Sequence, residues 1–429
     1  MVMAKQGIIL TATAALIASV GLTGFQLANP SAAAFRNSPK ETVDEVWQII
    51  NREYVDGTFN KVDWQQTRRK FLQRNYNSKA DAYAAIREML KSLDDPYTRF
   101  MDPEQFKSMQ IDTSGELTGV GIQLTVDEAT KNLVVASPIE DSPAAKAGIV
   151  AKDVLVNISG QSTKGMEINR AVELIRGPVG TKIKLVVQRG DRTFEIELVR
   201  ARIEIHPVKA EVRNAPIGKV GYLHLRQFNG NATKDMRKAL EAQIKEGVTG
   251  FILDLRSNPG GLLYSSAEIA RLWLENATIV STVDRGGEGD RLVANRQALT
   301  DKPLVVLVDK GSASASEILA GALQDNKRAT IVGTQTFGKG LVQSVHPLGD
   351  GSGLAVTIAK YLTPDGTDIN RSGIKPDVVV ELSVADREKI SKNRELFGTN
   401  ADPQFAKALE ILTNRVKAAK GANSTASRT

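Results

Sequence analysis

The sequence predicts an α/β fold in which a helical region and a second, β-rich domain precede or interrupt the core. Three changes in hydrophobic periodicity support this prediction. Apolar residues recur at helical spacing in residues 35–110, short β-type runs fill residues 111–200, and strands alternate with helices in residues 201–383. We take these three ranges as domains and expect a C-terminal helix with a flexible tail in residues 384–429.

The composition narrows the class of protein. The chain has 429 residues, enough for several domains with full-sized cores, and is 41% hydrophobic and 24% charged, as ordinary globular proteins are. A net charge of +7 without arginine runs among aromatic residues gives no reason to expect nucleic-acid binding. The absence of cysteine excludes thiol catalysis, cysteine-based zinc sites and disulfides.

Residues 1–34 have the pattern of an export signal. After Lys5, an apolar run covers residues 8–20, and Ala32 and Ala34 form a small-residue cleavage site. We therefore expect a signal peptide and a mature protein that works outside the cytoplasm. The alternative is an uncleaved anchor, because the uncharged stretch is long enough to span a bilayer, and the protein would then associate with a membrane.

The helical region shows two amphipathic segments. In "ETVDEVWQIINREYV" the apolar residues Val43, Val46, Trp47 and Ile50 recur at helical spacing. "NSKADAYAAIREMLKSL" repeats the pattern with Ser78 as the expected N-cap, and the proline-containing loop "LDDPYTRFMDPEQF" follows. We expect these apolar faces to form a core.

The β-rich segment contains the glycine-framed sequence "GVGIQL" followed by "SPAAKAG" and a closing pair of strands. This order resembles a PDZ domain, a module that captures the C-terminus of a polypeptide. Backbone N–H groups around Gly119, Val120 and Gly121 can cradle a terminal carboxylate, and the strand that starts at Ile122 can accept the tail as an extra strand. The plainer alternative is a small β domain with a glycine turn.

The α/β segment carries three loops after apolar strands. "GFILDLRS" leads into "NPGG", "PLVVLVDK" into "GSASAS", and "RATIVGT" into "QTFGKG". Strands that alternate with helices indicate a mainly parallel sheet, and sites in such sheets lie at the carboxyl ends of the strands. The three loops are therefore expected to meet at one edge.

Lys339 first suggests a phosphate-binding loop, because Gly333 and Gly338 have the P-loop spacing. Gly340, however, stands where a hydroxyl should bind magnesium, and the neighbours Phe337 and Leu341 favour desolvation of the lysine. A P-loop lysine must stay charged, whereas a lysine base must be neutral, which requires a fall from the ordinary pKa of about 10.4. We therefore expect a base in acyl transfer and no nucleotide.

The nucleophile must come from Ser312, Ser314 and Ser316, which spacing alone does not separate. Ser314 also forms an S-x-x-E capping box with Glu317, so a purely structural role as a helix cap would be enough to explain a serine at this position. A serine at a helix N-terminus nevertheless gains from the helix dipole, and the N–H of Ala315 is a natural oxyanion donor, with a second donor expected from "NPGG".

Gln343 follows Lys339 by four residues, so the two side chains lie on one side of a helix or a strand. Its amide could orient the amine without adding charge, or it could be a structural polar residue. Spacing leaves both roles open.

"GSASASEILAGALQDNKRA", "TFGKGLVQSV" and "FILDLRSNPGGLL" together resemble the carboxyl-terminal processing peptidases, also called tail-specific proteases. The resemblance covers nearly the whole mature chain. It implies Ser314 as nucleophile, Lys339 as base and Gln343 as the residue that orients the lysine. It also implies oxyanion donors at the backbone N–H groups of Ala315 and Gly261.

The same resemblance implies a crotonase-like α/β core with an inserted PDZ domain and a helical region through which relatives dimerise. Arg176 in "IRGPVG" matches a position that links the PDZ domain to the catalytic site in relatives. No metal, nucleotide or organic cofactor is implied. The motifs are most similar to the branch from oxygenic photosynthetic organisms, whose members include the enzyme that trims a photosystem II reaction-centre subunit in the thylakoid lumen. The expected compartment is the periplasm or the thylakoid lumen.

Two rival functions remain. A trypsin-like protease with a PDZ domain would need a histidine base, for which His346 is the nearest residue, but "VHPL" most simply ends a strand. A non-enzymatic PDZ scaffold would bind the tails of exported proteins without cutting them. We expect instead an exported serine endopeptidase that binds the C-terminal tails of protein substrates and cuts near them.

Overall fold

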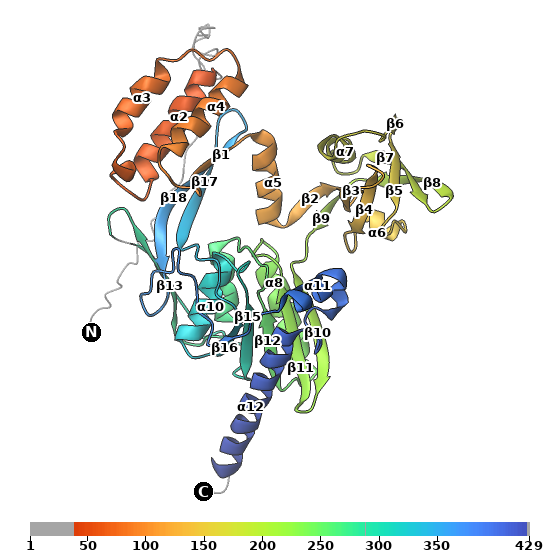
Figure 1. The fold of residues 1–429 in the computed structure, drawn as a ribbon, viewed down its shortest axis with the longest axis vertical. Helices are drawn as coiled ribbons and strands as arrows, with labels where there is room; N and C mark the ends of the chain where they lie inside the picture. The colour runs from red at the N-terminus through yellow and green to blue at the C-terminus, as the bar shows by residue number, and fades with distance from the viewer. Residues whose placement is uncertain (1–37, 288, 427–429) are drawn as a thin grey trace, which may run out of the picture.

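The computed structural model describes residues 38–287 and 289–426, which form a helical bundle, a β-rich domain and an α/β core (Figure 1). The bundle lies at one end of the molecule and the core at the other, and the β-rich domain stands to one side. The predicted signal peptide, residues 1–34, lies outside the described residues. Within those residues, no helix is long and apolar enough to cross a bilayer.

The bundle consists of three helices and one 3-10 turn: α2 (Pro39–Glu53), η1 (Phe59–Lys61), α3 (Trp64–Leu72) and α4 (Lys79–Lys91). The helical spacing of the apolar residues is confirmed, because Val46, Trp47 and Ile50 lie in one buried cluster with residues of α3 and α4. Ser78 accepts a hydrogen bond from the third N–H of α4, as expected of an N-cap.

The β-rich domain is one sheet with two helices and its own apolar core. Its elements are β3 (Ile122–Val126), β4 (Leu133–Pro138), α6 (Pro143–Lys146), β5 (Val154–Ile158), β6 (Gln161–Ser162), α7 (Ile168–Ile175), β7 (Lys182–Arg189) and β8 (Arg192–Val199). The main strand order is β3-β4-β5-β7-β8, so β3 lies at an edge.

A two-stranded ribbon joins this domain to the rest of the chain. After β1 (Arg99–Met101), helix α5 (Pro103–Ser114) leads into β2 (Glu116–Gly119), which pairs antiparallel with β9 (Ala201–Glu204). The chain thus enters and leaves the domain side by side (Figure 1). Helix α5 crosses our expected domain limit at residue 110 and lies between the two domains.

The core is a six-stranded sheet in the order β10-β11-β12-β15-β16-β19. The strands are β10 (Val208–Ala215), β11 (Gly218–Leu225), β12 (Gly250–Asp254), β15 (Leu304–Val308), β16 (Ala329–Gly333) and β19 (Val378–Val379), parallel from β11 onward. Alternate residues of a strand enter different clusters: Leu304 and Val306 face one, and Val305 faces the other.

Helices cover both faces of this sheet. One face packs on α8 (Ala232–Lys245), α9 (Leu263–Arg271) and α10 (Ala315–Asp325), whose buried residues share a cluster with the strands. The other face packs on α12 (Pro403–Ala426). The mainly parallel α/β core expected from the sequence is therefore present.

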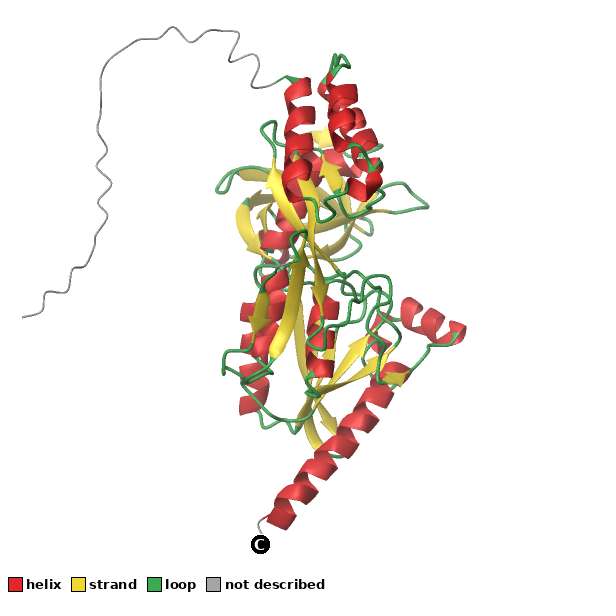
Figure 2. Cartoon of the chain, turned by 90° about the vertical axis from the view of Figure 1, so that its left-hand side faces the viewer, coloured by secondary structure: helices red, strands yellow, loops and turns green. Residues whose placement is uncertain are grey.

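A second sheet connects the core to the bundle. It contains β1, β13 (Thr278–Asp284), β14 (Arg291–Val293), β17 (Leu341–Pro347) and β18 (Gly353–Leu362). Strand β18 is long: Leu354 and Val356 belong to the apolar cluster of the bundle, whereas Tyr361 belongs to that of the core. Figure 2 shows these strands running between the two bodies.

The C-terminal region differs from the expectation of a short helix and a flexible tail. It forms α11 (Val384–Lys392), a 3-10 turn η2 (Arg394–Leu396) and the 24-residue helix α12, which reaches Ala426. Phe405 and Leu412 are buried against the sheet, and a buried ion pair of 2.8 Å joins Asp402 to Arg256. Within the described chain the buried residues of α12 end at Val416, so packing on a sheet face that local composition does not reveal accounts for the helix up to that residue.

Candidate active site

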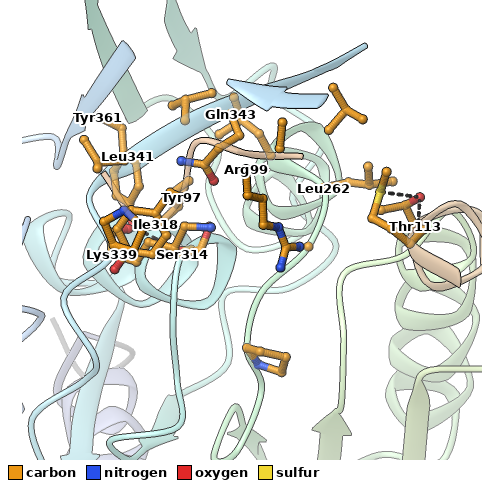
Figure 3. A pocket seen from close by; sticks show the side chains of 18 of the residues that line it. Tyr97, Arg99, Thr113, Leu262, Ser314, Ile318, Lys339, Leu341, Gln343 and Tyr361 are labelled. Carbon is orange, nitrogen blue, oxygen red and sulfur yellow. Dashed lines mark hydrogen bonds between the residues drawn. The ribbon is translucent and has the colours of Figure 1, made fainter. Parts of the chain in front are cut away.

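Three loops meet at one edge of the core sheet. They follow β12, β15 and β16, which are adjacent parallel strands, so their carboxyl ends share that edge. Together with the bridging sheet they enclose a cavity of about 400 Å³ that is lined by Ser314, Lys339 and Gln343, among others (Figure 3). The structure thus brings together the three residues that the resemblance assigns to catalysis.

The structure distinguishes the three serines that spacing left equivalent. Ser312 is buried and donates its hydroxyl to the carbonyl of Leu255 at 2.8 Å, and Ser316 is buried and donates to the carbonyl of Asn258 at 2.9 Å. Both hydroxyls therefore hold the loop after β12 in place. Ser314 is the one of the three that lines the cavity.

Ser314 starts α10 in an unusual conformation. Its φ of 55° and ψ of −114° lie outside the extended region in which N-cap residues normally sit. It forms a capping box with Glu317, whose carboxylate accepts a hydrogen bond from the Ser314 N–H at 2.8 Å. The structural role that the sequence suggested for Ser314 is thus present together with its position in the cavity.

The "NPGG" loop packs directly on this turn. A Cβ at Gly260, which has a φ of 99°, would lie 2.6 Å from the carbonyl oxygen of Ala313 and 2.9 Å from the nitrogen of Ala315. Gly261 lines the cavity, and no turn or loop hydrogen bond of the described chain uses its N–H. The N–H of Ala315 is in the first turn of α10, which helical hydrogen bonds leave free.

Lys339 lies partly buried beside Ser314 (Figure 3). Burial lowers the pKa of its amine, and the positive charge of Arg99 lowers it further, while Asp95 and Glu317 act in the opposite direction. The amine lies 4.9 Å from the centre of the Tyr97 ring. A strand, β17, follows the loop, whereas a P-loop leads into a helix.

Gln343 occupies β17 as its alternating pattern indicated, next to a β-bulge between Val342 and Gln343. Its side chain lines the cavity, and its buried Nε2 has no partner within the described chain. No hydrogen bond of the described chain joins the Lys339 amine to Ser314 or to Gln343. His346, the rival base, lies outside the cavity lining, with its Nε2 2.7 Å from a carboxylate oxygen of Glu53.

Glu317 connects the two loops in a way that the sequence did not reveal. Its buried carboxylate accepts the N–H groups of Ser314, Gly338 and Lys339 at 2.8, 2.7 and 2.9 Å, and the hydroxyl of Thr336 at 2.5 Å. The sequence indicates Glu317 only as half of a capping box. The S-x-x-E motif was its signal, but the contacts to residues 336–339 depend on the tertiary fold.

Tyr361 and Arg99 were missed as well. The Tyr361 hydroxyl donates to the carbonyl oxygens of both Ser314 and Lys339, which joins the two loops a second time. Arg99, on β1, points into the cavity (Figure 3). Both come from segments far away in sequence, so no local pattern could have identified them.

The predicted tail-binding loop lies on the β-rich domain. The carbonyl groups of Val120 and Gly121 accept hydrogen bonds from Ala144 and Ile139, both at 2.9 Å, whereas no turn or loop hydrogen bond of the described chain uses their N–H groups. Gly121 has a φ of 80°, and a Cβ there would lie 2.2 Å from the Cβ of Ser142. Ile122 begins β3, whose outer edge is unpaired in the described sheet.

Arg176 follows α7 on the same domain. Within the described chain it makes no hydrogen bond or ion pair with the core. Its coupling role stays a prediction.

Comparisons with known proteins agree with this architecture. Residues 219–380 match the family described as peptidase family S41, and residues 134–189 match the PDZ domain family. A carboxyl-terminal-processing protease of Synechocystis sp. is 44% identical over 398 residues, which cover 92% of this chain and 91% of the relative.

Two further relatives come from photosynthetic systems. A chloroplastic carboxyl-terminal-processing peptidase 2 of Arabidopsis thaliana is 42% identical, covering 84% of this chain and 72% of the relative. The solved structure of a photosystem II D1 C-terminal processing protease matches with a TM-score of 0.55 and 37% identity, covering 86% of this chain and 100% of that one.

Proposed function

Because this chain belongs to peptidase family S41 and is a C-terminal processing serine peptidase with a PDZ domain, we propose that Ser314 is its nucleophile and Lys339 its general base. The observation that carries this proposal is that Ser314, unlike Ser312 and Ser316, shares the cavity with a desolvated lysine. Membership of a peptidase family sets aside the non-enzymatic scaffold.

In this mechanism the neutral amine of Lys339 removes the Ser314 proton as the hydroxyl oxygen attacks the scissile carbonyl carbon. The protonated amine then donates to the departing amine of the substrate, which leaves an acyl-enzyme that water resolves. The N–H groups of Ala315 and Gly261 hold the negative oxygen of each tetrahedral intermediate. This assignment is supported by two observations: no turn or loop hydrogen bond of the described chain uses the N–H of Ala315 or of Gly261, and Gly260 packs closely on the turn of Ser314.

Gln343 orients Lys339 in the proposed active enzyme. The partnerless Nε2 in the cavity supports a role in which the amide completes its hydrogen bonds only with lysine or substrate in place. An amide serves this purpose better than a carboxylate, since a negative charge would raise the pKa of the lysine.

The PDZ domain binds the substrate tail. We assign the terminal carboxylate to the loop Gly119–Ile122 and the tail to the open edge of β3 as an added strand. The proposed substrates are C-terminal tails of exported or membrane proteins. The similarity to the solved photosystem II D1 C-terminal processing protease extends this proposal to the C-terminus of a photosystem II subunit. The compartment that we propose is the periplasm or the thylakoid lumen.

Alanine variants of the candidate residues test the catalytic assignment. We expect Ser314→Ala and Lys339→Ala to abolish cleavage of a free-tail peptide while the proteins stay folded, and Ser312→Ala to retain activity with reduced stability. His346→Ala separates the two protease types, because it remains active if Lys339 is the base. An active Lys339→Ala variant would refute the Ser-Lys mechanism.

A further inference from the structure

The active-site cavity contains a second cation, Arg99, to which the proposed mechanism gives no contact with the substrate. Lys339 and Arg99 are the charged residues of its lining, which includes no carboxylate. The remaining lining is mostly apolar or aromatic and includes Met101, Met109 and Leu262. When Lys339 is neutral, as its role as a base requires, Arg99 is the charge that a bound peptide meets.

Strand register fixes where Arg99 points. Arg99 pairs with Ala355 of β18, and Ala355 pairs on its other side with Val345 of β17. Directly paired residues share a face of a sheet, and all three line the cavity, so this row forms one of its walls. The small side chain of Ala355 leaves room for a ligand beside the guanidinium.

Figure 3 places Arg99 between two parts of the site. Ser314 and Lys339 lie on one side of it, and Leu262 and Thr113 on the other. A peptide that reaches the hydroxyl of Ser314 and extends toward α5 therefore passes the guanidinium.

Arg99 has no protein partner for its charge. Within the described chain it makes no hydrogen bond or ion pair, whereas Arg87 of the neighbouring α4 pairs with Asp102 at 3.2 Å. A guanidinium offers a planar pair of donors that matches a carboxylate, and charge-assisted pairs of this kind are strong and specific. The free donors of Arg99 and the absence of acidic residues from the cavity lining favour a carboxylate as the ligand of this wall.

We infer that Arg99 forms a carboxylate subsite next to the scissile bond. This inference rests on the proposed function of the cavity. The carboxylate has two sources with the same chemistry, an acidic side chain of the substrate within a few residues of the cut or the new C-terminus of the product. Arg99 would select substrates with an acidic side chain near the cut, or it would retain the product by its new C-terminal carboxylate after cleavage.

Paired peptides test the side-chain source. Each pair places one aspartate or one asparagine at a single position within three residues of the cut. For wild type we expect kcat/KM to favour aspartate by about tenfold or more at one position, the size of one charge-assisted hydrogen bond. In Arg99→Gln the ratio falls to about one. Arg99→Gln also changes the pKa of Lys339, but this change affects kcat/KM for both peptides of a pair equally. It therefore cancels in the ratio, which compares two peptides with the same variant.

Product inhibition tests the second source. If the ligand is the new C-terminus, a product peptide with a free carboxylate inhibits wild type more strongly than its amide does, and Arg99→Gln loses the difference. Lys107→Gln, which removes an exposed charge on α5 outside the lining, should behave as wild type in both assays.

Equal ratios in wild type and Arg99→Gln, in both assays, would overturn the subsite. Retained cleavage by wild type and its loss in Ser314→Ala would still support the proposed function, so the two can fail separately.

Discussion

Lys339 shows how single residues set the conditions for this chemistry. Its ordinary pKa of 10.5 would keep nearly all of it protonated at neutral pH, and burial lowers that pKa first, with Arg99 second. Asp95 and Glu317 oppose these effects. The balance between one neighbouring cation and two anions therefore tunes the proposed base.

This balance predicts opposite pH shifts in two variants. The active form of Lys339 is neutral, so kcat/KM should rise with pH through the pKa of the amine. Arg99→Gln removes a cation that disfavours protonation, which raises that pKa and moves the rising limb to higher pH. Asp95→Asn removes an anion that favours protonation and moves the limb to lower pH.

A neutral peptide substrate should be used for these profiles, so that any carboxylate binding by Arg99 does not contribute. If kcat/KM rises over the same pH range in wild type, Arg99→Gln and Asp95→Asn, Lys339 is not the base whose titration controls the reaction.

Replacing Glu317 should lower kcat by displacing the loops that carry Ser314 and Lys339. Each carboxylate oxygen of Glu317 accepts two hydrogen bonds, and Glu317→Gln replaces one of these oxygens with an NH2 donor. Two of the four hydrogen bonds that join the loops of Ser314 and Lys339 are therefore lost. We expect kcat to fall by roughly 100-fold, the usual effect of displacing catalytic groups by about 1 Å. Thermal unfolding of the same sample separates misplacement from loss of the fold, and Glu104→Gln on the exposed side of α5 is the control.

At the residue scale, local motifs and the family resemblance were enough to predict the candidate catalytic residues. The cluster of three serines, Lys339 and Gln343 all lie where the three loops were expected to meet. Choosing Ser314 needed the resemblance first, and then the burial of Ser312 and Ser316. Arg99 could not have been predicted, because strand pairing across more than two hundred residues brings it to the cavity.

At the scale of elements, the turn after β12 depends on glycine. Gly260→Ala should nearly abolish activity, because the new Cβ would collide with the backbone of residues 313 and 315 at a φ of 99°. Gly366→Ala has a similar φ of 82° but no atom within 4 Å, so it should cost only about 1 to 2 kcal/mol of stability. Peptide cleavage and denaturant unfolding of both variants check this difference, and equal activity in both would contradict it.

Helix α12 is predicted to stabilise the core. Leu412 is fully buried on the sheet beside Gly250, so Leu412→Ala should lower the free energy of unfolding by about 2 to 5 kcal/mol. Lys417→Ala, on the exposed side of the same helix, should change it little. Urea unfolding measures both, and a loss of less than about 1 kcal/mol for Leu412→Ala would mean that the helix packs loosely.

The elements also show where sequence patterns reach their limit. Helical spacing predicted the bundle and continuous apolar runs predicted the core strands, since each pattern reflects the faces that the element buries. The alternation of Leu341, Gln343 and Val345 predicted the strand β17. The end of the chain was interpreted as flexible because its composition is polar. The structure instead has one helix that reaches Ala426, and its residues Phe405, Leu412 and Val416 pack on an apolar sheet face formed by residues far earlier in the chain.

At the scale of the whole molecule, the PDZ domain and the catalytic core are separate bodies joined by the ribbon of β2 and β9 (Figure 1). The PDZ domain has its own apolar cluster, which includes Leu155 and Leu185. The sequence indicated both bodies but not their placement, which depends on α5 and on the pairing of β2 with β9 across more than eighty residues of chain. Tail binding and cleavage are therefore proposed to occur at two distinct places on one substrate.

The most direct test of this account is cleavage of peptides offered with a free and with an amidated C-terminus, with the products identified by mass spectrometry. The account predicts that the protein cuts the free-carboxylate peptides at one internal bond, cuts the amidated ones at least about tenfold more slowly, and loses all cleavage in Ser314→Ala. Equal cleavage of both forms would contradict tail recognition, and cleavage by Ser314→Ala would contradict the assigned nucleophile.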